Sequence, residues 1–161
     1  KTIPQRTVKI ANKSAFTLNK HFLEIQHGDI VAFPPEEMDS EKQEGSFVVK
    51  HENLLHDLLV VASYFISDQD IYFVLKLNWT AGGLRSENPE CTCGFVNRVK
   101  GTDINGLDWH QVSRKVTVGK VKIKTRLHYR ESGSEIVIEI LSKALPMWSH
   151  ISSEVFHKIQ P

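Results

Sequence analysis

Residues 120–141 read KVKIKTRLHYRESGSEIVIEIL, and this stretch decides the fold class. Basic side chains occupy every second position from Lys120 to Arg130, and apolar or neutral side chains fill the positions between them. Only an extended strand has a period of two, because its successive side chains point to opposite faces. The pattern therefore predicts a β-strand with one basic face and one apolar face.

A second strand follows directly and completes a hairpin. Residues 131–134, Glu-Ser-Gly-Ser, suit a hairpin loop, and isoleucines at every second position mark the strand after it. If Arg130 lies opposite Glu135, apolar pairs share one face and opposite charges share the other, whereas a shift of one residue mixes them. The same register pairs Tyr129 with Ile136, Leu127 with Ile138, and Arg126 with Glu139.

The rest of the chain carries further strand patterns. Residues 6–12 alternate apolar and polar side chains, and residues 71–79 form an aromatic and β-branched run. The length of 161 residues suits one domain. We therefore predict an all-β protein, an antiparallel β-sandwich with one or two short helices, as a single domain over residues 1–161. Residues 1–4 are expected to form a tail, and residues 145–161 a C-terminal helical extension.

Composition and motifs narrow the class of function. The formal net charge of +1 gives no general attraction to nucleic acid, so no nucleic-acid partner is expected. Cys91 and Cys93 are separated by one residue, a spacing too strained for an ordinary disulfide, and no further ligands complete a metal site. The short motifs of nucleotide-binding proteins, serine hydrolases and zinc peptidases are missing. We expect a non-enzymatic protein with free thiols, no metal and no cofactor; the compartment stays open.

Four segments, in this order along the chain, carry a resemblance to a known family. They are residues 5–14 (QRTVKIANKS), 62–68 (ASYFISD), 103–110 (DINGLDWH) and 132–144 (SGSEIVIEILSKA). Together they resemble the actinoporins, which belong to the cytolysin and lectin superfamily of β-sandwiches. The resemblance implies a sandwich that docks on membrane lipid through an aromatic loop and a phosphocholine pocket. It also implies insertion of an N-terminal helix and assembly into oligomers on membranes.

The chain departs from the actinoporin pattern at each of these working parts. Four residues precede Gln5, so the inserting helix is expected to be missing or to have been removed. Residues 78–85 replace the aromatic loop, and Trp79 is the one aromatic side chain there that could reach lipid. The tyrosine-rich helix expected between Lys100 and Asp103 is absent, and with it most of the aromatic cage for choline. We therefore expect binding to membrane surfaces without efficient permeabilisation.

The leading hypothesis for the site is a lipid-headgroup contact made by two loops. Trp79 and Arg85 lie on one loop, and Trp109 and His110 lie on the other. An indole suits the boundary between water and lipid because its ring is amphipathic. Three alternatives stay open: the two tryptophans are packing residues, the loops form a carbohydrate-binding lectin site, or the domain is a protein–protein interaction module.

Three lysines of the first strand have no acidic partner in the predicted hairpin. They are Lys120, Lys122 and Lys124. They are interpreted either as a solvated face, where lysine on an edge strand discourages pairing with another chain, or as an anion-binding patch.

Overall fold

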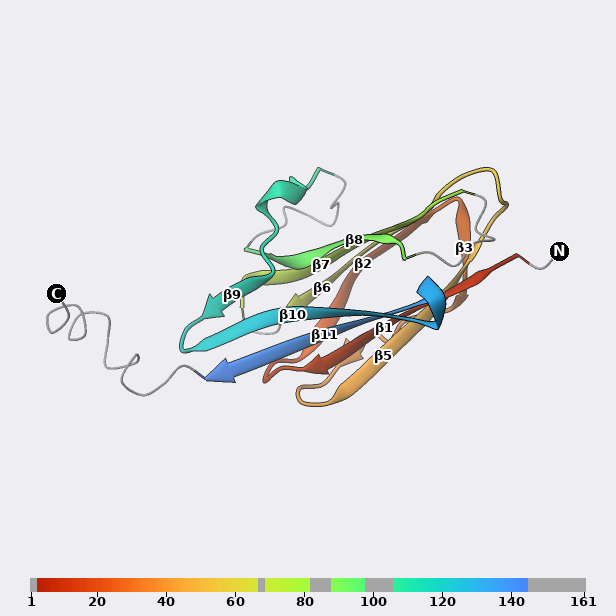
Figure 1. The fold of residues 1–161 in the computed structure, drawn as a ribbon. Helices are drawn as coiled ribbons and strands as arrows, with labels where there is room; N and C mark the ends of the chain where they lie inside the picture. Colours follow the sequence, from red (N-terminus) through yellow and green to blue (C-terminus); the bar gives the residue numbers. More distant parts are fainter. Residues whose placement is uncertain (1–2, 67–68, 82–87, 98–105, 145–161) are drawn as a thin grey trace, which may run out of the picture.

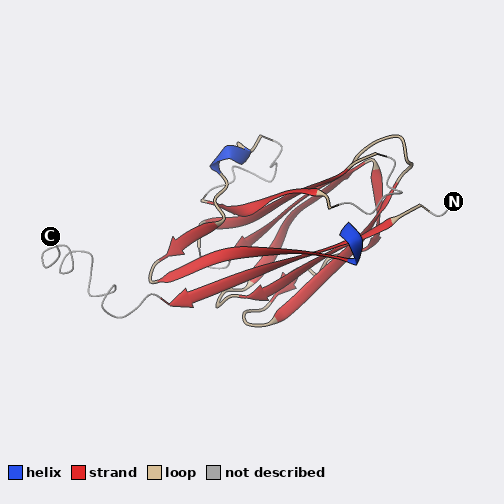
Figure 2. Cartoon of the chain, viewed as in Figure 1, coloured by secondary structure: helices blue, strands red, loops and turns tan. Residues whose placement is uncertain are grey.

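The computed structural model describes residues 3–66, 69–81, 88–97 and 106–144, which form two β-sheets packed face to face (Figure 1). Loops and short turns connect the strands (Figure 2). In chain order, the elements are β1 (Gln5–Lys13), β2 (Leu18–Gln26), β3 (Gly28–Ala32), β4 (Glu37–Met38), β5 (Gln43–His51), β6 (Leu58–Ile66), β7 (Ile71–Trp79), β8 (Glu90–Val96), the 3₁₀ turn η1 (Trp109–Gln111), β9 (Lys115–Val118), β10 (Val121–Arg130), the 3₁₀ turn η2 (Glu131–Gly133) and β11 (Glu135–Ala144).

The order of the strands gives the sandwich two distinct sides. One sheet runs β3-β5-β1-β11-β10-β9, and the other runs β4-β2-β6-β7-β8. Across the sandwich β8 contacts β9 and β10, whereas β4 contacts β5 and β2 contacts β3. The edge strands β8 and β9 therefore form one side, called the β8–β9 side below, and β3 and β4 form the opposite side. This arrangement confirms the predicted β-sandwich.

The hairpin of β10 and β11 has the register predicted from the sequence. Arg130 lies opposite Glu135, and the pairing continues without a shift to Val121 and Ala144. On the inner face Ile136 and its alternate neighbours are fully buried, because the apolar positions of both strands turn toward the other sheet. The alternation of the sequence was sufficient to fix this register.

One pairing in the otherwise antiparallel sandwich is parallel. β1 lies between β5 and β11, and it pairs with β5 in antiparallel and with β11 in parallel. Alternation identifies Val8 and Ile10 as the buried side of β1, but it does not say which strand lies beside it. The parallel neighbour also changes an ion pair, because Lys9 Nζ lies 3.6 Å from Glu135 Oε1. Among the described residues no ion pair joins Glu135 to Arg130, although the two face each other.

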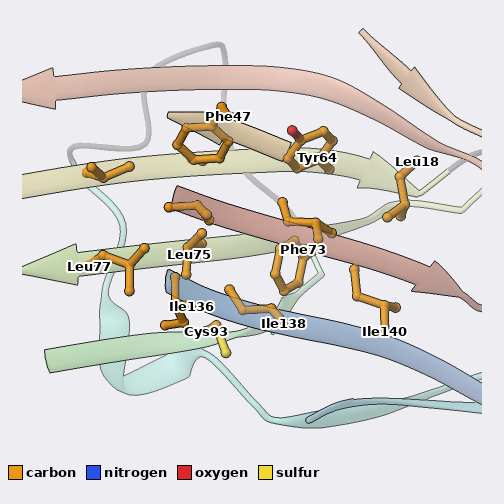
Figure 3. Close-up of a cluster of buried hydrophobic side chains, with 14 of the residues drawn as sticks. Leu18, Phe47, Tyr64, Phe73, Leu75, Leu77, Cys93, Ile136, Ile138 and Ile140 are labelled. Atoms are coloured by element: carbon orange, nitrogen blue, oxygen red, sulfur yellow. The ribbon is translucent and has the colours of Figure 1, made fainter. Parts of the chain in front are cut away.

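Large apolar side chains from both sheets fill the space between them. Figure 3 shows Phe73, Leu75 and Leu77 of β7 in the same cluster as Ile136 and Ile138 of β11. Full burial of one such side chain stabilises a fold by about 1.5–3 kcal/mol. This core holds the two sheets together and fixes which side chains remain on the outer faces.

Two further points concern helices. The predicted C-terminal helix, residues 145–161, lies outside the described residues. Within the described residues, no helix has the length and apolar character needed to cross a membrane.

Candidate functional site

Trp79 lies in the core, at the end of β7. Its side chain is only 1% exposed, and its Nε1 donates a hydrogen bond of 3.0 Å to the Gly133 carbonyl in η2. The Arg6 guanidinium carbon lies 5.8 Å from the ring centroid. The hypothesis of a lipid contact at Trp79 is therefore wrong, because the alternation of β7 turns this ring inward and η2 closes over it. Arg85, expected on the same loop, lies outside the described residues.

Trp109 and His110 lie in the turn η1, outside the core. Asp108 begins the turn, and its carboxylate accepts a 3.0 Å hydrogen bond from the His110 backbone N–H. His110 is exposed, whereas Trp109 is half-buried against a small apolar cluster on the outer face of the five-stranded sheet. That cluster consists of Val61 with Phe22, Leu59, Tyr72 and Val96. The Lys76 ammonium nitrogen lies 4.7 Å from the centroid of the Trp109 ring.

A close approach of two backbone segments holds this turn against the sheet. The Phe95 N–H donates to the Ser113 carbonyl at 2.7 Å, and the Ser113 N–H donates back to Phe95 at 3.0 Å. Gly94 lies beneath this contact, and a Cβ atom at Gly94 would lie 2.3 Å from the Ser113 oxygen. Only glycine fits here, so Gly94 lets the chain after η1 rest on β8.

The three described residues of the predicted lipid site therefore do not form one surface. Trp79 points into the sandwich, and Trp109 covers the outer face of the same sheet. His110 is the single exposed member of the set among the described residues. What remains of the predicted site is the η1 turn, with a half-buried indole beside an exposed imidazole.

On the outer face of the six-stranded sheet, several basic side chains share one carboxylate. Glu139 of β11 accepts hydrogen bonds from Arg126 Nε at 2.8 Å and His128 Nε2 at 2.6 Å, and it also pairs with Lys13 Nζ. Its side chain is 7% exposed. The hydrogen bonds from Arg126, Lys13 and His128 hold the pKa of Glu139 well below its usual range. These three basic side chains are thus all in contact with one carboxylate of the protein.

A second group of basic side chains on this sheet has no such partner. It consists of Lys115, Lys120, Lys122, Lys124 and Lys143, and is called the lysine cluster below. All five are exposed, and no carboxylate of the described residues lies within ion-pair distance of them. Lys122 lies directly opposite Lys143, and Lys124 lies directly opposite Lys115. The sequence indicated Lys120, Lys122 and Lys124, but Lys115 and Lys143 join them through strand pairings that the lysine pattern itself does not encode.

The β8–β9 side brings the η1 turn close to the lysine cluster. A cavity of about 450 Å³ opens there, with Gln111 of η1 and Lys115 of β9 among its lining residues. Trp109 lies two residues before Gln111 in the chain, and Lys115 is the first lysine of the cluster. We treat this side of the sandwich as the candidate functional site.

The two cysteines lie on β8 as free thiols, as the spacing predicted. Cys93 is buried and Cys91 is half-buried. The neighbouring Cys91 thiol and the Arg114 guanidinium lower the pKa of the Cys93 thiol from its ordinary value. In the described residues, no group of three or more histidine, cysteine or acidic side chains has the arrangement of a metal site.

Comparison with known proteins supports the fold. No family model and no curated protein sequence matches this chain. Among solved structures, the chain is similar to the crystal structure of the lipid-binding protein Nakanori, with a TM-score of 0.57 and 12% sequence identity. The match covers 89% of this chain and 72% of that chain. At this identity the likeness establishes the fold alone, and membership of the actinoporins stays a prediction.

Proposed function

We propose that this protein binds lipid headgroups at membrane surfaces and catalyses no reaction. The observation that carries the proposal is the ammonium of Lys76, which lies 4.7 Å from the centroid of the half-buried Trp109 ring on the outside of the sandwich. The similarity of the fold to that of the lipid-binding protein Nakanori supports a ligand of the same class.

The contact between Lys76 and Trp109 demonstrates what this ring attracts. The face of an indole carries partial negative charge, so it attracts a cation placed within about 6 Å of its centroid. The choline group of a phospholipid is a quaternary ammonium and binds aromatic rings through the same attraction. The Lys76 side chain is long and unbranched, so it can move aside and leave the ring face to a choline group.

The position of Trp109 also suits a membrane surface. The ring lies in a turn beside the exposed His110, and its other contacts are apolar side chains of the sheet. Indole rings concentrate at the headgroup level of membranes because they are apolar in body and polar at the N–H. The η1 turn would therefore meet the headgroups while the sheet beneath it stays rigid.

Binding to phosphatidylcholine vesicles tests this proposal. Replacing Trp109 with alanine removes the attraction to the cation, so we expect binding weaker by about 2- to 30-fold, which corresponds to about 0.5–2 kcal/mol. Replacing Lys76 with methionine removes the competing ammonium and keeps the apolar stem, so we expect binding at least as strong as that of the unaltered protein. Vesicle co-sedimentation measures both, with circular dichroism to confirm folding.

Three results would contradict the proposal or redirect it. Unchanged binding by folded Trp109→Ala would exclude the indole as the contact. Glycan-array binding that is lost in Trp109→Ala, without vesicle binding, would favour the lectin alternative. Binding to neither vesicles nor glycans would leave the protein-interaction alternative.

A further inference from the structure

We propose that the lysine cluster docks the protein on membranes that carry acidic phospholipids. The inference rests on the membrane binding proposed above and adds the lipid class. It starts from the outer face of the six-stranded sheet, whose two ends differ. Toward one end, Glu135 pairs with Lys9, and Glu139 pairs with Lys13, Arg126 and His128. Toward the other end, the five lysines have no acidic partner among the described residues.

The pairing of the strands makes this an unfavourable arrangement in the free protein. Lys122 faces Lys143 and Lys124 faces Lys115, each pair directly opposite across neighbouring strands. Like charges in that position destabilise a sheet, whereas an opposite charge stabilises it. Two such pairs side by side repel each other as well, and an external anion relieves all of these repulsions at once.

Protection of a sheet edge does not account for the cluster. Lysines discourage a free edge strand from pairing with another chain. β9 is an edge strand, so this explains Lys115, but β10 and β11 are interior strands whose backbone groups are already paired. Lys122, Lys124 and Lys143 therefore need another explanation, and a ligand with several negative charges provides one.

The chemistry of the cluster favours a membrane over a single phosphate or a nucleic acid. Arginine is the side chain that recognises one phosphate through two parallel hydrogen bonds, and Arg126 of this face is already paired with Glu139. Lysine acts instead as a hydrated point charge, which suits a diffuse layer of headgroups. The five lysines spread over three neighbouring strands and a turn, so they would meet several headgroups together.

The distribution of acidic residues strengthens this inference. Residues 36–44 contain five exposed acidic side chains, and they lie at β4 and the start of β5 on the opposite side of the sandwich from β9. The chain has a net charge of only +1, and these five acidic side chains lie toward β4 whereas most of the lysine cluster lies toward β9; Glu41 and Glu44 line a cavity with Ser142, the neighbour of Lys143. An acidic membrane would attract the β8–β9 side and repel the β3–β4 side, so the molecule would approach in one orientation.

Vesicles with and without an acidic lipid test the inference on the full chain. We expect stronger binding to phosphatidylcholine vesicles when phosphatidylserine is added, and loss of that increment at high salt. A membrane-proximal lysine contributes about fivefold to such binding, so Lys122→Gln with Lys143→Gln should lower it by about 30-fold. Lys42→Gln with Lys50→Gln removes the same charge outside the cluster and should have little effect. Thermal unfolding should show Lys122→Gln with Lys143→Gln as stable as the unaltered protein or more so, because it relieves repulsion.

The arms of this experiment separate the inference from the proposed function. Trp109→Ala should weaken binding to phosphatidylcholine alone and keep the increment from phosphatidylserine. Lys122→Gln with Lys143→Gln should instead keep binding to phosphatidylcholine alone and lose most of the increment from phosphatidylserine. Equal binding to the two kinds of vesicle, or equal losses in the cluster and control variants, would overturn the inference and leave the role of Trp109 standing. Duplex DNA binding as tightly as the acidic vesicles would replace the membrane by a soluble polyanion and also overturn it.

Discussion

Glu139 decides which basic side chains on the outer face are available to a ligand. Its carboxylate holds Arg126, His128 and Lys13, and these contacts lower its pKa, so it stays ionised well into the acid range. Arg126 and His128 belong to the same alternating pattern as Lys122 and Lys124. One acidic residue on the neighbouring strand therefore divides the basic face of β10 into a part that contacts a carboxylate and a part that does not.

The position of Trp79 was encoded in the sequence. Ile71, Phe73, Leu75 and Leu77 precede it at every second position, and all of them are buried. A period of two places Trp79 on the same inner face, so the alternation of its own strand was a better guide than the expectation of an aromatic lipid-binding loop.

We predict that Trp79→Phe destabilises the protein without changing its affinity for vesicles. The substitution leaves a cavity and removes the hydrogen bond to the Gly133 carbonyl, so we expect a loss of about 2–3 kcal/mol in the free energy of unfolding. Urea unfolding measures this loss. Trp109→Phe is the matched control, and because that ring is half-buried it should lose less than about 1 kcal/mol. Equal losses in the two variants would show that Trp79 is not the core residue described here.

At the scale of elements, local sequence patterns predicted where each strand lies better than they predicted which strands pair with it. The hairpin of β10 and β11 was fully predictable, because its two strands are adjacent in the sequence and one register alone matches both faces. The parallel pairing of β1 with β11 joins the two ends of the described chain, and no short-range pattern specifies it. For the same reason the sequence did not predict that Lys115 and Lys143 belong to the lysine cluster, because their positions beside Lys124 and Lys122 depend on strand pairing.

The contact between β8 and the segment after η1 leads to a second prediction. Gly94→Ala would place a methyl group 2.3 Å from the Ser113 carbonyl oxygen, so the segment must move away from β8. We expect a loss of about 1–3 kcal/mol in stability and weaker binding to phosphatidylcholine vesicles, because the Trp109 turn is displaced. Gly106→Ala is the control, since no atom lies within 4 Å of a Cβ at that position. Unaltered stability and binding in Gly94→Ala would show that this contact does not position the turn.

At the scale of the whole molecule, the two surfaces proposed to meet lipid lie on the outer faces of different sheets, Trp109 on the five-stranded sheet and the lysine cluster on the six-stranded sheet, and they approach each other at the β8–β9 side. The η1 turn and β9 lie on the β8–β9 side, while β3 is the other edge of the same six-stranded sheet. Within the described part of the chain, both edge strands have a row of backbone N–H groups without a partner strand, so their amide exchange with solvent is sensitive to whatever covers them.

Because β3 and β9 are the two edges of one sheet, hydrogen exchange directly tests how the protein is oriented on a membrane. When the protein binds vesicles of phosphatidylcholine and phosphatidylserine, we expect slower exchange in Trp109–Gln111 and Lys115–Val118, because headgroups exclude water from the β8–β9 side. Gly28–Ala32 in β3 is the internal control and should exchange at the rate of the free protein, since it lies at the far edge near the acidic residues 36–44. Protection of β3 with no change in β9 would reverse the orientation and contradict both the role of Trp109 and that of the lysine cluster. Equal protection of the two edges would indicate a flat approach of the whole sheet, in which the charge difference between the two sides does not orient the protein.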